Sequence, residues 1–307
     1  MKTNVVLSQI RNIRKLCKDF GIYKGFKVWK FYKLIRLKRR KINWSDLIVD
    51  VNGYKLSLIP NDAGISTELA LFGIHEPLNT KMLAKQLRKD MICLDIGANI
   101  GYYTLLESKI VGNNGKIIAI EPSPVNFSKL QKNIQMEGAT NIEVYNLAAG
   151  DKDGKIKFLL KKQSNLSRIV SEDEIKPSDN IVEVPIRKLD GFLEERALKK
   201  LDFLRMDVEG YEFFIYMGIR NSIRKFSPTM QIEIHAHHLG EERTRELLEK
   251  LKEDGYETEY YIVRQIDIPT VGDMNDVKKV KIDNLLEMLD RKKLPTSFLL
   301  FLKNISK

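Results

Sequence analysis

The chain has 307 residues, of which 43% are hydrophobic and 30% are charged, a composition typical of a globular protein and not of a disordered one. That length accommodates one large domain, or a domain with an appendage. The two cysteines, Cys17 and Cys93, predict no disulfide framework and favour a reducing, cytoplasmic location. Because we find neither a long apolar span nor the apolar core of a signal peptide, we expect a protein that is soluble or attached peripherally to the inner membrane surface.

All of the excess positive charge lies at the start of the chain. Residues 1–45 hold fourteen lysines and arginines against one acid, Asp19, while the whole chain has a net charge of +11. Aromatic side chains, among them Tyr23, Phe26 and Trp29, stand between these cations. We predict a basic, aromatic-rich helical segment over residues 1–45. Three interpretations remain open: contact with an anionic membrane surface, binding of RNA as a less favoured alternative, or a solvated helix that packs on its own domain.

The folded part is predicted to begin near residue 46. Asn52-Gly53 lies between two short apolar runs, which is a strong signal for a two-residue β-hairpin. Two hairpin strands and two helices are expected here: Leu47–Val51, Tyr54–Ile59, Thr67–Phe72 and Leu78–Arg88. Residues 46–90 therefore lead into the main domain, residues 91–307.

A strand that turns through glycines into a helix organises the rest of the chain. Met91–Ile96 has the length and composition of a buried parallel strand. The loop that follows has the spacing Asp95-x-Gly97-x-x-x-Gly101, which is neither the dinucleotide fingerprint nor a phosphate-binding loop. Because an acid there repels a pyrophosphate but attracts an ammonium or sulfonium charge, the loop favours S-adenosylmethionine over NAD. The candidates for binding it are Asp95, Gly97, Ala98, Asn99, Gly101 and Tyr102.

The next strand and helix indicate where the adenosine would lie. Lys116–Glu121 is an apolar strand that ends in an acid, and an acid at this place accepts the hydroxyls of a ribose. Pro124–Glu137 predicts a helix, and Asn141–Asn146 predicts the third strand, whose end would lie beside the adenine. The adenosine-binding candidates are Glu121, Pro122, Asn146 and Ala148.

A polar excursion interrupts the strand and helix pattern. Lys155–Leu160 and Ile181–Ile186 have strand patterns, and between them lies the polar stretch Lys161–Asn180. A stretch of this kind inside a compact domain usually serves as a lid or substrate loop. We expect it near the methyl acceptor.

Four ionisable side chains lie at the ends of two more predicted strands, or just after them; the strands are Leu201–Asp207 and Thr229–His235. Ligands bind beyond the carboxyl ends of such strands, which places Asp207, Glu209, Glu233 and His235 beside the transferable methyl group. They are candidates for a general base and its partners, since a hydroxyl must lose its proton as it is methylated. A divalent cation is the alternative, but histidine is a poor ligand for magnesium, and we predict no metal.

The end of the chain completes the predicted sheet. Glu241–Glu253 is an amphipathic helix, and Tyr256–Val263 and Ser297–Leu302 are strands on either side of the charged connection Asp267–Asp290. The fold class is therefore α/β, with a doubly wound, mostly parallel seven-stranded sheet whose last pairs are antiparallel.

Four motifs in this order resemble those of the FkbM-type S-adenosylmethionine-dependent methyltransferases: LDIGANIGYYT from Leu94, IEPSP from Ile120, LRMDVEGYE from Leu204 and QIEIH from Gln231. The resemblance runs from about Ile48 to Lys303 and leaves the first forty-odd residues outside. It implies the Rossmann-like fold of the class I methyltransferases and O-methylation of sugars or natural products. Through a similar Glu-Pro step before the first motif, it also implies that Glu76 is a partner for the amino group of the cofactor. A capping or surface role is the alternative for Glu76.

The acceptor is predicted partly by exclusion. Enzymes that methylate exocyclic amines commonly carry an Asn/Asp-Pro-Pro-aromatic step where this chain has Asp207-Val208-Glu209-Gly210. We therefore expect a methyltransferase for a sugar hydroxyl in a small-molecule or lipid-linked glycan. Three alternatives stay open: an RNA methyltransferase that uses residues 1–45, methyl-ester formation on a carboxylate, and a non-catalytic module that keeps the cofactor fold.

Overall fold

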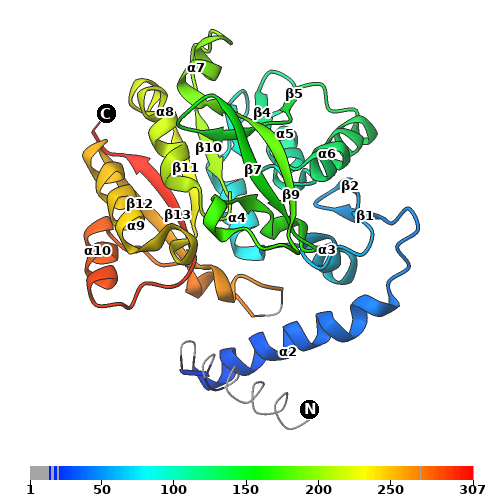
Figure 1. Ribbon diagram of the computed structural model, residues 1–307. Helices are drawn as coiled ribbons and strands as arrows, with labels where there is room; N and C mark the ends of the chain where they lie inside the picture. The colour runs from blue at the N-terminus through cyan, green and yellow to red at the C-terminus, as the bar shows by residue number, and fades with distance from the viewer. Residues whose placement is uncertain (1–13, 15–16, 19–20, 270, 307) are drawn as a thin grey trace.

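The computed structural model describes residues 14, 17–18, 21–269 and 271–306. Its centre is a seven-stranded sheet with the order β12-β13-β11-β10-β3-β4-β5 (Figure 1). Every strand runs parallel to its neighbours except β13, which is antiparallel to both. The strands are β3 (Ile92–Ile96), β4 (Lys116–Ile120), β5 (Ile142–Tyr145), β10 (Phe203–Met206), β11 (Thr229–Ile234), β12 (Tyr256–Val263) and β13 (Phe298–Asn304). The predicted seven-stranded α/β fold is confirmed, whereas the divisions near residues 45 and 90 stay predictions.

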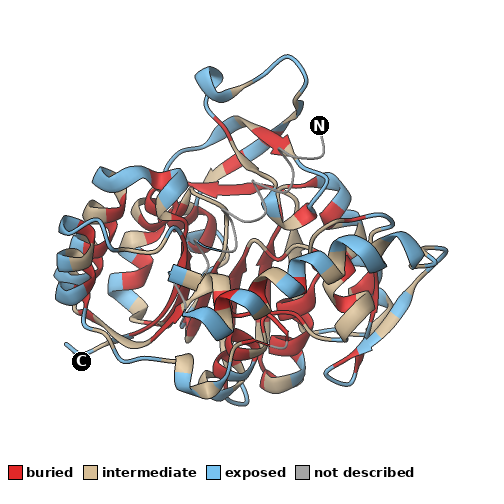
Figure 2. Cartoon of the chain, turned by 90° about the horizontal axis from the view of Figure 1, so that it is seen from below, coloured by how far each residue is buried: buried red, intermediate tan, exposed pale blue. Residues whose placement is uncertain are grey.

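Helices cover both faces of the sheet because its strands point apolar side chains alternately to either side. Leu94 and Ile118 pack on one face against α7 (Leu189–Glu194), α8 (Glu212–Phe226), α9 (Ala236–Glu253) and α10 (Ile282–Asp290). Cys93 and Ile117 pack on the other face, against the hairpin strands β1 (Ile48–Val51) and β2 (Tyr54–Ser57) and the helices α3 (Ile65–Phe72), α4 (Pro77–Gln86), α5 (Tyr102–Val111) and α6 (Pro124–Glu137). Figure 2 shows the buried strands between helices whose outer turns are exposed.

A second, smaller sheet follows β5 and has the order β6-β9-β7-β8. Its strands are β6 (Ala148–Gly150), β7 (Gly154–Leu160), β8 (Arg168–Ile169) and β9 (Asn180–Lys188). The polar excursion Lys161–Asn180 contains β8 and the 3-10 turns η2 (Ser164–Leu166) and η3 (Glu172–Glu174). The backbone N–H of Ser164 donates to Asp62 (2.8 Å), which ties this excursion to the loop before α3.

The basic segment contains the helix α2 (Ile22–Lys38), which continues into the turn η1 (Arg39–Lys41). Val28 and Phe31 are 1% and 2% exposed and pack on the segment that holds η4 (Arg264–Ile266). Lys24 pairs with Asp276, in the turn η5 (Met274–Asp276), and Figure 1 shows α2 lying across the bottom of the molecule. Most of the basic segment before Gly21 lies outside the described residues. Within the described part of the chain, no helix is long and apolar enough to span a membrane.

Candidate functional site

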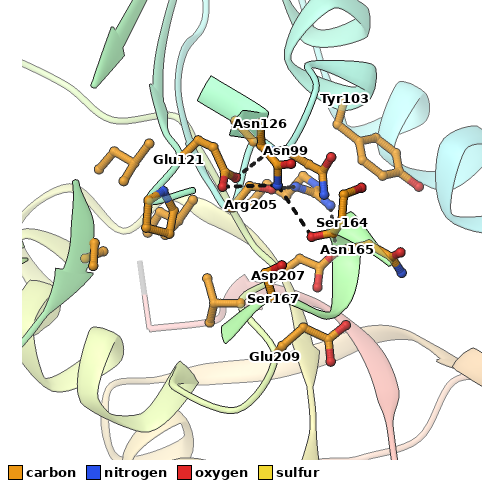
Figure 3. A pocket seen from close by; sticks show the side chains of 18 of the residues that line it. Asn99, Tyr103, Glu121, Asn126, Ser164, Asn165, Ser167, Arg205, Asp207 and Glu209 are labelled. Atoms are coloured by element: carbon orange, nitrogen blue, oxygen red, sulfur yellow. Dashed lines mark hydrogen bonds and ion pairs between the residues drawn. The ribbon is translucent and has the colours of Figure 1, made fainter. Parts of the chain in front are cut away.

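A cavity opens at the carboxyl ends of β3, β4 and β10, where the strand order of the sheet reverses. Its empty volume is about 770 Å³, part of it open to solvent, which lies within the range of small-molecule sites. Doubly wound sheets bind their ligands at this reversal of strand order. The cavity, which we call the cofactor cavity, is shown in Figure 3.

The loop after β3 forms one wall of the cofactor cavity. Gly97, Ala98 and Asn99 line it, together with Tyr102 at the start of α5. Gly97 has a φ of 87°, and a Cβ there would lie 2.0 Å from the carbonyl oxygen of Asp207. Glycine is therefore required because the loops after β3 and β10 touch backbone to backbone. The sequence predicts a close approach of ligand to this glycine, and the structure adds a close approach of the neighbouring loop.

Glu121 follows β4 and lines the cavity beside Pro122. Its carboxylate accepts the backbone N–H groups of Asn99 (2.8 Å) and Ser123 (2.8 Å) and the side-chain amide of Asn126 (3.3 Å). Burial raises the pKa of Glu121 to about 7, although these three donors act to lower it. The donors fix the carboxylate, which keeps lone pairs for the hydroxyls of a ligand.

Two side chains of the cavity lining have a buried polar atom without a partner among the described residues. Ser164 Oγ and Asn165 Oδ1 are buried, line the cavity and have no hydrogen-bond partner among the described residues. Ala148 and Phe158 add an apolar wall. A buried acid, an apolar wall and unpartnered polar groups together fit the ribose and adenine of S-adenosylmethionine. The sequence does not single out Ser164, Asn165 or Asn126, because polar residues in a loop carry no positional signal of their own.

Arg205 in β10 connects an acid of β3 with an acid that follows β10. It is 3% exposed, donates to Asp95 (2.9 Å) and Asp207 (3.0 Å), and lies 4.1 Å from the centre of the Tyr103 ring. Asp95 also accepts the hydroxyl of Thr104 (2.6 Å) and does not line the cavity. Its charge is therefore balanced by Arg205 and does not face the ligand directly. An arginine inside a buried strand is the sequence signal for this network, because such a charge needs buried acids.

Three further cofactor candidates lie away from the cavity lining. Glu76 is buried, and its carboxylate contacts His75 Nε2 (2.9 Å) and Arg264 Nη2 (2.6 Å). Gly101 has a φ of 95° and precedes α5, where it permits the turn into that helix. Asn146 donates its side-chain amide to the backbone carbonyls of residues 121 and 122 (2.8 and 3.1 Å), so it shapes the loop after β4.

The four predicted catalytic side chains come together at the ends of β10 and β11. His235 Nε2 lies 3.4 Å from both Glu209 and Glu233, and His235 Nδ1 lies 2.7 Å from Glu212. Burial acts to lower the pKa of His235, but the carboxylates of Glu233 and Glu209 outweigh it and raise the pKa well above 6.5. At neutral pH the imidazole therefore already holds its proton, so it stabilises the carboxylates around it and is not a base.

Asp207 and Glu209 are the carboxylates of this cluster that reach the cofactor cavity (Figure 3). Burial and the neighbouring Glu233 raise the pKa of Asp207 to about 6, against the opposing effect of Arg205. Glu209 has a φ of 56°, a backbone region that non-glycine residues rarely adopt and that is common at functional sites.

The same cluster also has the spacing of a metal site. Asp207, Glu233 and His235 each offer a ligand atom, and these atoms lie within 4.8 Å of one another. Carboxylate and imidazole ligands of this kind suit a divalent transition metal better than magnesium. The cation alternative considered for the sequence therefore stays open.

A second, wider hollow adjoins the cofactor cavity, and we call it the acceptor cleft. Its walls include Glu209, Glu233 and His235 on one side and Arg36 of α2 on another. Glu209 and Asn165 line both the cofactor cavity and the acceptor cleft. The two spaces therefore meet at the catalytic cluster.

Comparisons with known proteins agree with this arrangement. Residues 95–258, more than half of the chain, match the family model of the methyltransferase FkbM domain. Methyltransferase 1 of Beauveria bassiana is 26% identical over 147 residues, which cover 42% of this chain and 59% of that protein. Hexuronic acid methyltransferase AglP of Haloferax volcanii is 25% identical over 158 residues (51% and 61%). 2-O-methyltransferase NoeI of Sinorhizobium fredii is 25% identical over 175 residues (50% and 69%).

The matched region thus spans less than two thirds of the first two relatives, at 59% and 61% of their lengths. The range 95–258 that matches the family model contains the loop after β3, Glu121 and the catalytic cluster. The match confirms the cofactor expected from the sequence, S-adenosylmethionine, for which the cofactor cavity has fitting residues. The chain belongs to the FkbM methyltransferase family.

Proposed function

We propose that the protein is an S-adenosylmethionine-dependent O-methyltransferase that acts on a sugar hydroxyl in a glycan or glycolipid. The observation that carries this proposal is the junction of the cofactor cavity and the acceptor cleft at Glu209. A methyl donor in one space and an acceptor in the other would meet beside a carboxylate. Such positioning supplies much of the rate when the donor is already reactive.

The residues of the cofactor cavity have separable tasks. Glu121 would accept the ribose hydroxyls, and Ala148 and Phe158 would contact the adenine. When bound, the cofactor would supply a methyl group carried on a sulfonium sulfur, and the leaving group would be a neutral thioether. Arg205 keeps Asp95 and Asp207 paired, so the floor of the site is fixed before any ligand enters.

Glu209 is the base in this proposal. It lines both spaces, whereas Asp207 is held by Arg205 and lines only the cofactor cavity. As the new bond from oxygen to methyl carbon forms and the bond from sulfur to methyl carbon breaks, the hydroxyl proton passes to Glu209. The imidazolium of His235 lies 3.4 Å from Glu209, so a positive charge stands beside the carboxylate that would receive the proton.

Two observations favour a sugar hydroxyl over other acceptors. Acids occupy the positions after β10, where a base is useful for a hydroxyl but not for a carboxylate acceptor, which is already ionised. The name of one relative, a hexuronic acid methyltransferase, gives a sugar acid as acceptor, and the name of another, a 2-O-methyltransferase, gives an oxygen as the methylated atom.

Calorimetric titration is the first test, followed by methyl transfer. We expect S-adenosylmethionine and its demethylated product to bind at micromolar strength, and NAD not to bind. Labelled methyl should then pass to members of a glycan panel and not to an RNA panel or to carboxylates as an ester. The Glu209→Gln variant should bind the cofactor normally and transfer the methyl group far more slowly than the wild type. Failure of both cofactor forms to bind contradicts the proposal, and label on RNA or on a carboxyl group assigns one of the alternatives.

We also propose that α2 holds the protein against an anionic membrane surface. Ile22, Phe26 and Leu37 are 82%, 51% and 61% exposed, and exposed lysines stand between them. Apolar side chains among cations are the pattern of helices that lie in a membrane interface. Co-sedimentation with phosphatidylglycerol vesicles should exceed that with phosphatidylcholine and should be lost in the Phe26→Ser/Leu37→Ser variant. Equal sedimentation of both proteins with both vesicles contradicts this role.

A further inference from the structure

We propose that the acceptor cleft binds an anionic group of the sugar acceptor, a phosphate or a carboxylate, through Arg36, Arg39 and Arg40. This inference rests on the proposed function, because it assumes that the cleft takes the acceptor. It specifies the chemical class of the acceptor, which must be a charged glycan and not a neutral one. It also assigns a task to the end of α2, which lies before the matched range 95–258.

The packing of α2 fixes which side chains enter the cleft. Phe31 is buried, and its ring stacks on that of Phe72 at 5.2 Å between centroids. Ile35, one turn later, packs against the same apolar cluster. Side chains three to four residues apart share one face of a helix, so Phe31 and Ile35 lie on the face that packs against the protein. Arg36 lies beside that face, and the turn η1 follows directly after the helix. Arg36, Arg39 and Arg40 all line the cleft.

These arginines are not used elsewhere in the described part of the chain. The guanidinium groups of Arg36, Arg39 and Arg40 have no hydrogen bond or ion pair with any described residue, and neither has the ammonium group of Lys161 on the facing wall. A guanidinium has five donors in a planar fork that matches a phosphate or carboxylate. Three such groups within five residues therefore form an unfilled set of anion donors.

The acids of the cleft do not neutralise this set, because they have partners of their own. Glu68 contacts His75 Nδ1 (2.7 Å), and Glu209 and Glu233 both contact His235 (3.4 Å each). The unpaired charge at the α2 end of the cleft is therefore positive, whereas the carboxylates of the catalytic cluster surround the imidazolium of His235. A surface that carries one sign of charge concentrates ligands of the other sign.

This division of charge orients the acceptor. The anionic group would sit on the arginines, and a hydroxyl elsewhere on the same molecule would reach Glu209. Anchoring by a part of the substrate that does not react is a common way to position the reacting atom.

The test measures anion binding directly, without methyl transfer. Wild-type protein saturated with S-adenosylhomocysteine is titrated calorimetrically with inorganic pyrophosphate, glucose 1-phosphate, glucuronate and, as neutral reference, glucose. We expect at least one anionic probe to bind and glucose not to bind. The pattern among the three anions shows whether phosphate or carboxylate is preferred.

Two triple variants with the same change in net charge locate the site. Arg36→Gln/Arg39→Gln/Arg40→Gln should weaken binding of the anionic probe at least tenfold. The control, Lys30→Gln/Lys38→Gln/Lys41→Gln, removes three charges of the same basic segment that do not line the cleft, and it should change binding less than twofold. Equal loss in both variants means that the probe senses overall charge, and the proposal is then overturned. Absence of binding to the wild type overturns it as well.

The same titrations separate this inference from the proposed function. If S-adenosylhomocysteine does not bind while the arginine variant still loses the anion, the methyltransferase proposal fails and the anion site stands. If S-adenosylhomocysteine binds to all three proteins and the anion binds to none, the anion site fails and the methyltransferase proposal stands.

Discussion

Replacement of Glu121 by glutamine tests the cofactor cavity most directly. Asn99 and Ser123 donate their backbone N–H groups to different oxygens of this carboxylate, each at 2.8 Å. In either orientation, the new amide places an NH₂ group where one of these N–H groups needs an acceptor. The ligand also loses an ionised acceptor for its hydroxyls. We expect the affinity for S-adenosylmethionine to fall by about 1–3 kcal/mol, or about 5- to 150-fold.

The pH dependence of cofactor binding provides a second test of this prediction. Burial raises the pKa of Glu121 to about 7, so the carboxyl group is largely protonated at pH 6 and ionised at pH 8. Two hydroxyls can donate only to the ionised form, so binding favours loss of the proton. The affinity of the wild type should therefore rise about fivefold between pH 6 and pH 7, reach about tenfold at pH 8 and level off above it. Glutamine does not titrate, so the variant should show no such rise.

Calorimetry at pH 6, 7 and 8 measures both effects. Glu143→Gln is the matched control, because this carboxylate belongs to the neighbouring strand β5, is 43% exposed, pairs with Lys116 and the hydroxyl of Tyr145, and does not line the cavity. The control should bind as the wild type does at each pH. An unchanged dissociation constant in Glu121→Gln, or a pH dependence that persists in it, refutes the assignment of this residue to the ribose.

Four further predictions concern the rest of the site. Glu209→Gln should lower kcat by about 10²- to 10⁴-fold with an unchanged dissociation constant for the cofactor, because it removes the base; steady-state kinetics and calorimetry together test this. Arg205→Met should lower the free energy of unfolding in urea by about 3–5 kcal/mol, since it leaves Asp95 and Asp207 buried without their cation. Glu107 is fully buried without a partner among the described residues, and burial raises its pKa well above 4.5. The folded state therefore holds its proton while the unfolded state releases it, so stability falls as the pH rises above about 4.3, and Glu107→Gln should be more stable than the wild type at pH 8 but not at pH 4. Finally, a base mechanism predicts that a chelator leaves the rate unchanged; loss of activity that manganese or zinc restores would assign the catalytic cluster to a metal.

The sheet could be predicted because its central strands are buried on both faces and are therefore apolar along most of their length. Tyr256–Val263 and Pro124–Glu137 have the same bounds in the sequence analysis and in the structure. The helix predicted from Glu241 is α9, which begins at Ala236 but has a non-helical φ of 79° at Gly240, so its regular part starts where the pattern starts. Local periodicity and turn chemistry were sufficient for these elements.

Elements whose signal depends on distant partners escaped prediction. The charged connection Asp267–Asp290 contains α10, in which Ile282, Leu285 and Leu289 are buried. A helix of only nine residues is marginal by itself and depends on its packing, here with α9 and the sheet, so the local sequence gives it a weak signal. Arg205 is a similar case, because its role depends on Asp95 in another strand, β3, as well as on Asp207 nearby in the sequence.

Glu76 is connected to the catalytic cluster through Arg264. Its carboxylate binds Arg264 (2.6 Å), and Arg264 in turn contacts Glu233 (3.4 Å), which lies beside His235. The start of α4 is thereby linked through one guanidinium to the end of β11, where the catalytic cluster stands. Burial of so many acids is tolerable only because Arg264 and the imidazolium of His235 lie between them. The buried charges of this site therefore form a continuous network, and the position of Glu209 at the meeting of the two spaces depends on that whole network and not on its own neighbours alone.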